Sequence, residues 1–126
     1  MRYMMFIKHT EEQRKAAIPP SLFEEMGRFI EEMSRSGNFV AAGGLQPSSA
    51  GARVRLEKGR ITTTDGPFAE SKEMVGGYAL VDAASHEEAV TLAQRFMEIH
   101  LKHWPTFEGE CELRPLEEEA QPAPSA

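Results

Sequence analysis

The apolar positions along this chain follow two different periods, and the changes between them divide it into strands and helices. Short alternating or two-sided apolar runs predict strands, whereas apolar residues three and four positions apart predict helices. The helical spacing occurs in two segments, one after Pro19 and Pro20 and one after Ser85. The predicted strands are residues 3–7, 39–45, 52–57, 60–65, 74–82 and 110–115.

Both predicted helices carry signals at their ends. Ser21 with Glu24, and Ser85 with Glu88, have the spacing of a capping box, in which side chains bond to the free N–H groups near the first turn. Gly37 is expected to end the first helix, because glycine adopts the left-handed conformation without strain. The apolar stripes comprise Leu22, Phe23, Met26, Phe29, Ile30 and Met33 in the first helix, and Ala89, Leu92, Ala93 and Phe96 in the second.

The strands 52–57 and 60–65 predict a tight hairpin, because only Lys58 and Gly59 separate them. A two-residue loop fixes the pairing register of a hairpin. The expected pairs are Glu57 with Arg60, Leu56 with Ile61 and Val54 with Thr63, while Arg53, Arg55, Thr62 and Thr64 share the opposite face.

The order of elements predicts an α+β domain of the ferredoxin-like split βαβ plan, with this hairpin inserted between its halves. Two helices cover only one face of a four-stranded core sheet, yet the strands 3–7 and 74–82 are apolar on both faces. We therefore expect the second face to pack against that of another copy in a homodimer. The alternative is that the hairpin folds over this face within one chain.

Length and charge limit the domain organisation and the partners. The 126 residues suit one domain, which we place at 1–116, while residues 117–126 lack apolar periodicity and are expected to be disordered. The formal net charge is −6, and Glu117, Glu118 and Glu119 supply half of it. A mildly acidic body argues against nucleic-acid binding, which needs a basic surface.

Cysteine usage and the apolar runs predict a cytoplasmic protein. Cys111 is the single cysteine, which excludes an internal disulfide framework and fits a reducing compartment. The apolar run 3–7 is too short for a membrane span or the core of a signal peptide. The sequence shows no phosphate-cradling glycine loop, so no cofactor is expected. His100 and His103 lack the further ligands of a metal site, so no metal is expected either.

Residues 65–73, with the sequence DGPFAESKE, are the most informative stretch, because they close the hairpin and lead into the next apolar strand. Gly66 precedes Pro67, which favours turn or extended geometry at both positions. Phe68 is expected to be an apolar anchor. Asp65 has two interpretations: it caps the turn through backbone N–H groups, or it contacts a ligand.

The stretch Asp65–Glu73, the sequence Gly76-Gly77-Tyr78 and the middle segment 45–55 resemble the YCII-related, DGPF-domain family over roughly residues 1–115. The resemblance implies a dimeric α+β barrel. It also implies a link to distant members that are dehalogenating or lyase-type enzymes acting on small cyclic or muconate-like acids. Such proteins typically present a His–Asp pair in a cleft. Their histidine corresponds to about Met26 here, so this chain departs from that pattern.

His9 and Asp65 are the candidate catalytic pair, because the expected strand order brings the end of strand 3–7 toward the loop 65–73. An imidazole oriented by a carboxylate suits general acid–base catalysis near neutral pH. The alternative for His9 is an exposed histidine that merely follows a strand. The candidate substrate contacts are Pro67, Phe68, Ser71, Lys72 and Arg53, of which the two cations suit a small anionic metabolite.

Two functional hypotheses follow from the sequence. The first is a small-molecule-binding homodimer with cofactor-independent acid–base activity of the lyase or isomerase type. The second is a non-catalytic regulatory or protein-interaction dimer, in which the loop at Asp65 is chiefly a structural corner.

Overall fold

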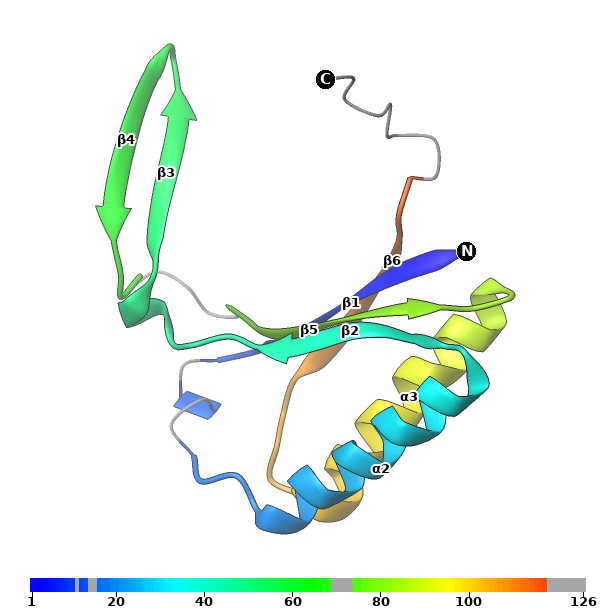
Figure 1. Ribbon diagram of the computed structural model, residues 1–126. Helices are drawn as coiled ribbons and strands as arrows, with labels where there is room; N and C mark the ends of the chain where they lie inside the picture. Colours follow the sequence, from blue (N-terminus) through cyan, green and yellow to red (C-terminus); the bar gives the residue numbers. More distant parts are fainter. Residues whose placement is uncertain (11, 14–15, 69–73, 118–126) are drawn as a thin grey trace.

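The core of the molecule is a four-stranded antiparallel sheet with two helices packed on one of its faces (Figure 1). The computed structural model describes residues 1–10, 12–13, 16–68 and 74–117. In chain order the elements are β1 (Arg2–His9), α2 (Pro20–Ser36), β2 (Phe39–Gly44), the short 3-10 helix η1 (Ser48–Ala50), β3 (Ala52–Glu57), β4 (Arg60–Asp65), β5 (Met74–Asp82), α3 (His86–His103) and β6 (Glu110–Pro115).

The core strands lie in the order β2-β5-β1-β6, and all neighbours are antiparallel. This order is the one that the split βαβ plan predicts, and it places β1 and β5 in the centre of the sheet. The predicted strands are confirmed, with small differences in the bounds of two strands. The first is longer than 3–7, and the second ends at Gly44 rather than Leu45. Of the predicted tail 117–126, only Glu117 is among the described residues.

One face of the central strands forms the hydrophobic core with the helices. Tyr3 and Met5 of β1 and Val81 of β5 are almost completely buried. They belong to one cluster with Phe29 of α2 and Leu92 of α3. Each fully buried apolar side chain of this size stabilises the fold by about 1.5–3 kcal/mol relative to an exposed one, so this layer holds the helices on the sheet.

The other face of the sheet carries apolar side chains as well. Met4 and Phe6 of β1 are paired with Leu80 and Tyr78 of β5, at the positions that alternate with the core residues. Both helices lie on the opposite side of the sheet (Figure 1). The centre of this open face is therefore apolar and carries no helix.

The ends of the helices confirm one predicted capping box and correct the other. The hydroxyl of Ser85 accepts a hydrogen bond from the backbone N–H of Glu88 at 3.1 Å, at the start of α3. Ser21 is not the cap of α2, because this helix begins one residue earlier, at Pro20, and has no side-chain cap. Proline is suited to the first helical position, since its fixed φ matches the helix and its missing N–H needs no partner there. Gly37 ends α2 with φ 84°, as predicted.

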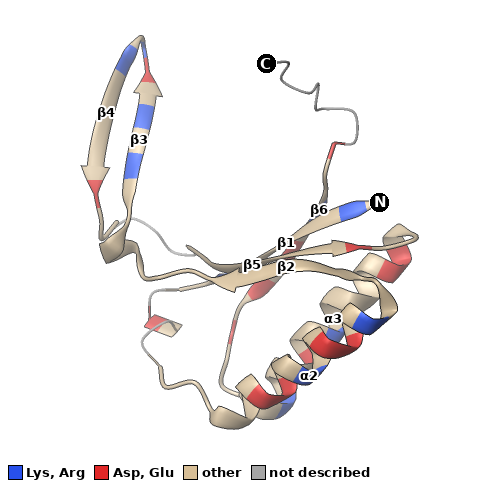
Figure 2. Cartoon of the chain, viewed as in Figure 1, with Lys and Arg blue, Asp and Glu red and all other residues tan. Residues whose placement is uncertain are grey.

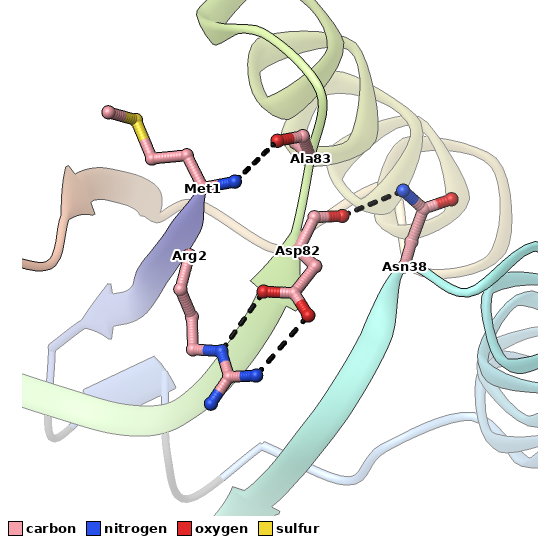
Figure 3. Close-up of polar contacts among 5 residues, drawn as sticks. All are labelled: Met1, Arg2, Asn38, Asp82 and Ala83. Carbon is pink, nitrogen blue, oxygen red and sulfur yellow. Dashed lines mark hydrogen bonds and ion pairs between the residues drawn. The ribbon is translucent and has the colours of Figure 1, made fainter. Parts of the chain in front are cut away.

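Polar contacts fasten the start of β1 to the end of β5 (Figure 3). Arg2 donates from Nε and Nη2 to the two carboxylate oxygens of Asp82, at 3.0 and 3.3 Å. The hydrogen bond from Arg2 lowers the pKa of this carboxyl group. The terminal ammonium of Met1 donates to the carbonyl of Ala83 at 3.1 Å, and Nδ2 of Asn38 donates to the carbonyl of Asp82 at 2.8 Å. These contacts join the ends of β1, β2 and β5.

The strands β3 and β4 form a separate two-stranded sheet, which we call the arm (residues 52–65). Its register is the predicted one, including the pairs Leu56 with Ile61 and Glu57 with Arg60. Lys58 and Gly59 both have positive φ, 51° and 77°, which is the geometry of a tight hairpin turn. The arm extends from the body on the side of the core sheet opposite the helices (Figure 1).

Replacement of Ser85 by alanine is expected to lower the free energy of unfolding by about 1 kcal/mol, because α3 loses its side-chain cap. Urea denaturation followed by circular dichroism measures this change. Ser21→Ala is the matched control and should cost less than about 0.5 kcal/mol, since its side chain caps no N–H group of α2. Equal losses for the two variants would contradict the assignment of the caps.

Candidate functional site

A cavity of about 570 Å³ lies between α2 and the helix-facing side of the core sheet. Its walls come from the apolar stripe of α2, from β1, from the loop after β2 and from the last turn of α3. Four glycines on two neighbouring strands also line it: Gly43 and Gly44 of β2, and Gly76 and Gly77 of β5. Only Gly44 leaves open space beside it, because an added Cβ at each of the other three would meet another atom within 3.1 Å.

The side chain of His9 lies at the end of β1 and lines this cavity. Its Nδ1 is 3.0 Å from the carbonyl oxygen of Thr10, so Nδ1 carries the proton in the neutral ring and Nε2 has the lone pair. The imidazole packs directly on Gly76, where an added Cβ would lie only 1.8 Å from Nε2. Gly76 thus provides the room that the position of His9 requires.

Aromatic rings close the end of the cavity near α3. The ring of His100 lies 4.6 Å from that of Phe96 and 4.8 Å from that of Phe107, between ring centres. Phe107 also contacts Trp104 at 5.2 Å and His9 at 6.2 Å. Such spacings are typical of stacked and edge-to-face aromatic pairs, so these residues form one packed cluster.

His100 is the buried titratable group of this cluster. Its side chain is only 7% exposed, and Nδ1 lies 3.0 Å from the carbonyl oxygen of Phe96, four residues earlier in the same helix. Burial lowers the pKa of His100, because the charged ring would lose its hydration, and the bond to Phe96 opposes this only in part. The imidazole is therefore neutral at physiological pH.

The residues that line the cavity are mostly apolar, with a few uncharged polar groups. Besides the two histidines, the polar residues of the lining are Gln13, Gln46 and Tyr78. Tyr78 alternates with the core positions, so its side chain belongs to the open face of the sheet. Oε1 of Gln13 accepts a hydrogen bond from the backbone N–H of Glu108 at 3.2 Å, which ties the segment before α2 to the loop before β6. Among the described residues of the lining there is no Asp, Glu, Lys or Arg.

The sequence DGPF, residues 65–68, forms a packed corner at the base of the arm. The backbone N–H of Gly66 donates to the carbonyl of Gly51 at 2.9 Å, and an added Cβ on Gly66 would lie 1.7 Å from the carbonyl oxygen of Ser48. The Gly66–Pro67 peptide bond is cis. The guanidinium of Arg53 lies over the half-buried ring of Phe68, 4.0 Å from its centre.

The predicted site residues therefore divide between two places. His9 lines the cavity, whereas Asp65 is exposed at the end of β4, paired with Ala52, and is not among the described residues of the cavity lining. Pro67, Phe68 and Arg53 lie with Asp65 at the corner. Ser71 and Lys72 fall outside the described residues.

Sequence reasoning missed His100 and Gly76 as parts of this site. From the sequence, His100 is paired only with His103, as a candidate metal ligand. The signal for its place in the core is that it follows Phe96, on the apolar stripe of α3, by four residues. Within the described parts of the chain, no group of three or more His, Cys, Asp or Glu side chains comes together as a metal site. Cys111 is a free thiol packed beside the core, and burial raises its pKa to about 11.

Replacement of Gly76 by alanine is expected to lower the free energy of unfolding by about 1–3 kcal/mol, because the new methyl group overlaps His9. The same substitution in a His9→Ala background should cost much less, since the overlapping ring is gone. Denaturant unfolding of the single and double variants measures this coupling. A cost at Gly76 that is independent of His9 would contradict the close packing of the two residues.

Gly44→Ala is the matched control for the same experiment. This glycine also lines the cavity, but an added Cβ meets no atom within 4 Å. Alanine there should be neutral or slightly stabilising, because it lowers the conformational entropy of the unfolded chain.

Within the described residues, no helix is long and apolar enough to cross a membrane.

Comparison with known proteins identifies the family of this chain. The family model of the YCII-related domain matches residues 1–100 of the chain. An uncharacterised protein of Rhizobium meliloti (strain 1021) is 36% identical to it over 100 residues, which cover 74% of this chain and 77% of that protein. The chain therefore belongs to the YCII-related domain family.

Proposed function

We propose that this protein is a homodimer that binds a small molecule in the cavity between α2 and the core sheet. The observation that supports this most strongly is the cavity itself, about 570 Å³ of mainly apolar space with a few uncharged polar side chains. Binding sites for small molecules commonly have this size and composition, with apolar walls for affinity and a small number of polar groups for orientation.

A second candidate function is proton transfer in the same cavity, of the lyase or isomerase type and without a cofactor. His9 is the candidate base, because it lines the cavity and its Nε2 has the lone pair of the neutral ring. The sequence adds Asp65 as the carboxylate partner, and Arg53, Pro67, Phe68, Ser71 and Lys72 as substrate contacts. The described members of this set lie at the corner of the arm and do not line the cavity. The alternative is a non-catalytic regulatory dimer, which the packing of Arg53 on Phe68 at the corner favours.

The proposed dimer rests on two apolar surfaces on the same side of the molecule. One is the open face of the core sheet, where Met4 and Phe6 stand beside Leu80 and Tyr78. The other is one face of the arm, where Val54, Leu56 and Ile61 are 68%, 73% and 71% exposed. A second copy that packs on the open face and contacts both arms would remove these side chains from water.

The charge of the arm favours a second copy as the partner. Residues 52–65 include four basic and two acidic residues, which give the arm a net charge of +2. Because the whole chain has a net charge of −6, the rest of the chain has a net charge of −8. Figure 2 shows the basic residues along the projecting arm and many of the acidic residues on the body. An arm of one copy is thus attracted to the body of another. We also propose a cytoplasmic location, which suits the free thiol of Cys111.

Gly44→Leu is expected to abolish small-molecule binding without unfolding the protein. Its side chain extends from a strand position that lines the cavity and has open space beside it. A thermal-shift screen with cyclic and aromatic metabolites, both anionic and neutral, measures binding to the native protein. A ligand at 100 times its Kd stabilises the fold by about 2.7 kcal/mol, and Gly44→Leu should remove this shift.

Gly27→Leu is the control for the screen. Gly27 lies on the exposed side of α2, and an added Cβ there also meets no atom within 4 Å, but this residue does not line the cavity. Hits should therefore persist in Gly27→Leu. Hits that survive in Gly44→Leu would place binding elsewhere, and a complete absence of hits would count against the proposed function.

Leu56→Asp is expected to weaken the dimer at least tenfold, because it places a charge in the apolar face of both arms. Burial of one leucine side chain contributes about 1.5–3 kcal/mol, and a symmetric dimer contains the change twice. Sedimentation equilibrium measures the dissociation constant. Thr62→Asp adds the same charge to the opposite face of the arm and should have little effect. A monomeric native protein, or equal effects of the two variants, would contradict this interface.

A further inference from the structure

The neutral ring of His100 has a hydrogen-bond acceptor that no described residue satisfies. Its Nδ1 lies 3.0 Å from the carbonyl oxygen of Phe96, and a carbonyl can only accept, so Nδ1 carries the proton. Nε2 then has a lone pair in a side chain that is 7% exposed. Within the described residues, the hydrogen bond of this ring goes to Phe96, and its aromatic contacts are tilted pairs with Phe96 and Phe107.

Buried acceptors in folded proteins are nearly always paired with a donor from the protein, from ordered water or from a ligand. His100 lines the cavity, and so do its aromatic neighbours Phe96, Phe107 and Trp104. A molecule in the cavity therefore meets apolar rings and the acceptor Nε2 of His100 at this end. Such a molecule donates a hydrogen bond to Nε2 of His100 if it carries a hydroxyl or N–H group.

The charge of the lining limits the molecule further. A carboxylate or phosphate in this cavity would lose much of its hydration, and none of the described lining residues is a Lys or Arg that compensates for the loss. His100 does not supply a positive charge either, because burial keeps its ring neutral. The arrangement thus favours an uncharged ligand.

We propose that the cavity binds an uncharged, mainly apolar ring compound with one hydroxyl or N–H group that donates to Nε2 of His100. The proposal rests on the proposed function, since it names the class of ligand for the same cavity. This ligand differs from the small anionic metabolite that is expected from the sequence. That expectation rests on the positive charges of Arg53 and Lys72.

Three related probes test this class of ligand in the native protein. They are 2-naphthol, its methyl ether 2-methoxynaphthalene, and 2-naphthoate. The three have the same ring system, but the ether cannot donate a hydrogen bond and the naphthoate is an anion. Fluorescence titration at pH 7 should show that 2-naphthol binds roughly three- to tenfold more tightly than the ether, which is the contribution of one neutral hydrogen bond. The naphthoate should bind at least roughly tenfold more weakly than 2-naphthol.

Substitutions then locate the hydrogen bond. His100→Phe keeps a ring in the aromatic cluster but removes the acceptor, so 2-naphthol and its ether should bind equally. His103→Phe, on the same helix but away from the lining, should keep the preference, and so should His9→Phe, which removes the other histidine of the cavity. The preference for 2-naphthol over its ether is measured first in the native protein. That measurement can contradict the proposal whether or not the His100→Phe variant folds.

A further pair of variants separates the cavity from a second hollow, between α3 and β6, that His100 also borders. Gly44→Leu blocks the cavity and should abolish binding of 2-naphthol. Gln94→Trp fills the second hollow from an exposed position and should leave binding unchanged.

The outcomes distinguish the failure of this inference from that of the proposed function. Binding of all three probes without preference, tighter binding of the naphthoate, or a preference that depends on His9 and not on His100 would overturn the inference and leave the cavity as a binding site. Loss of binding in Gln94→Trp and not in Gly44→Leu would overturn it as well. Failure of every probe to bind would overturn the proposed function and this inference together.

Discussion

The structure depends on the apolar character of β1 and β5, the two central strands, on both of their faces. On one face, Tyr3, Met5 and Val81 pack against α2 and α3 and are almost completely buried. On the other face the alternating residues are apolar too, and neither helix lies on that side. The first face explains why the domain folds as it does. The second, with the projecting arm, is the surface on which our proposed dimer rests.

The cavity results from a local exception to this packing. Where β2 and β5 run side by side, both strands contain glycine pairs, and the sheet presents backbone rather than side chains to α2. The ring of His9 fills the space beside Gly76, whereas the space beside Gly44 is empty of protein atoms. The same strand pair therefore positions a histidine and leaves room next to it. A core filled by branched residues would have been more stable but would have had no space for a ligand.

The corner at the base of the arm is tightly packed, in contrast to the cavity. Gly66 packs so closely on the carbonyl of Ser48 that a side chain there is not tolerated, and Phe68 lies under the guanidinium of Arg53. These contacts set the direction in which the arm leaves the body. The corner and the cavity are connected through β5, which begins after the corner and continues along the cavity with Gly76 and Gly77. Residues 65–68 thus form a packed corner, and in our proposal this corner also presents the arm to the partner.

The residue pattern predicted most of the local features: the six strands, the two long helices, the cap at Ser85, the turn at Lys58 and Gly59 and the resulting register of the arm. The start of α2 was not among them, because proline suits a first helical position and Ser21 suits a cap, and the local pattern allows both. Nor did it determine the site. His100 and His9 are far apart in the chain, and only the packing of α3 against the sheet brings both to one cavity around Phe107. Side-chain periodicity predicts which face of an element is buried. Empty space and unpaired polar atoms arise from the fit between elements that are distant in the chain, which no local pattern records.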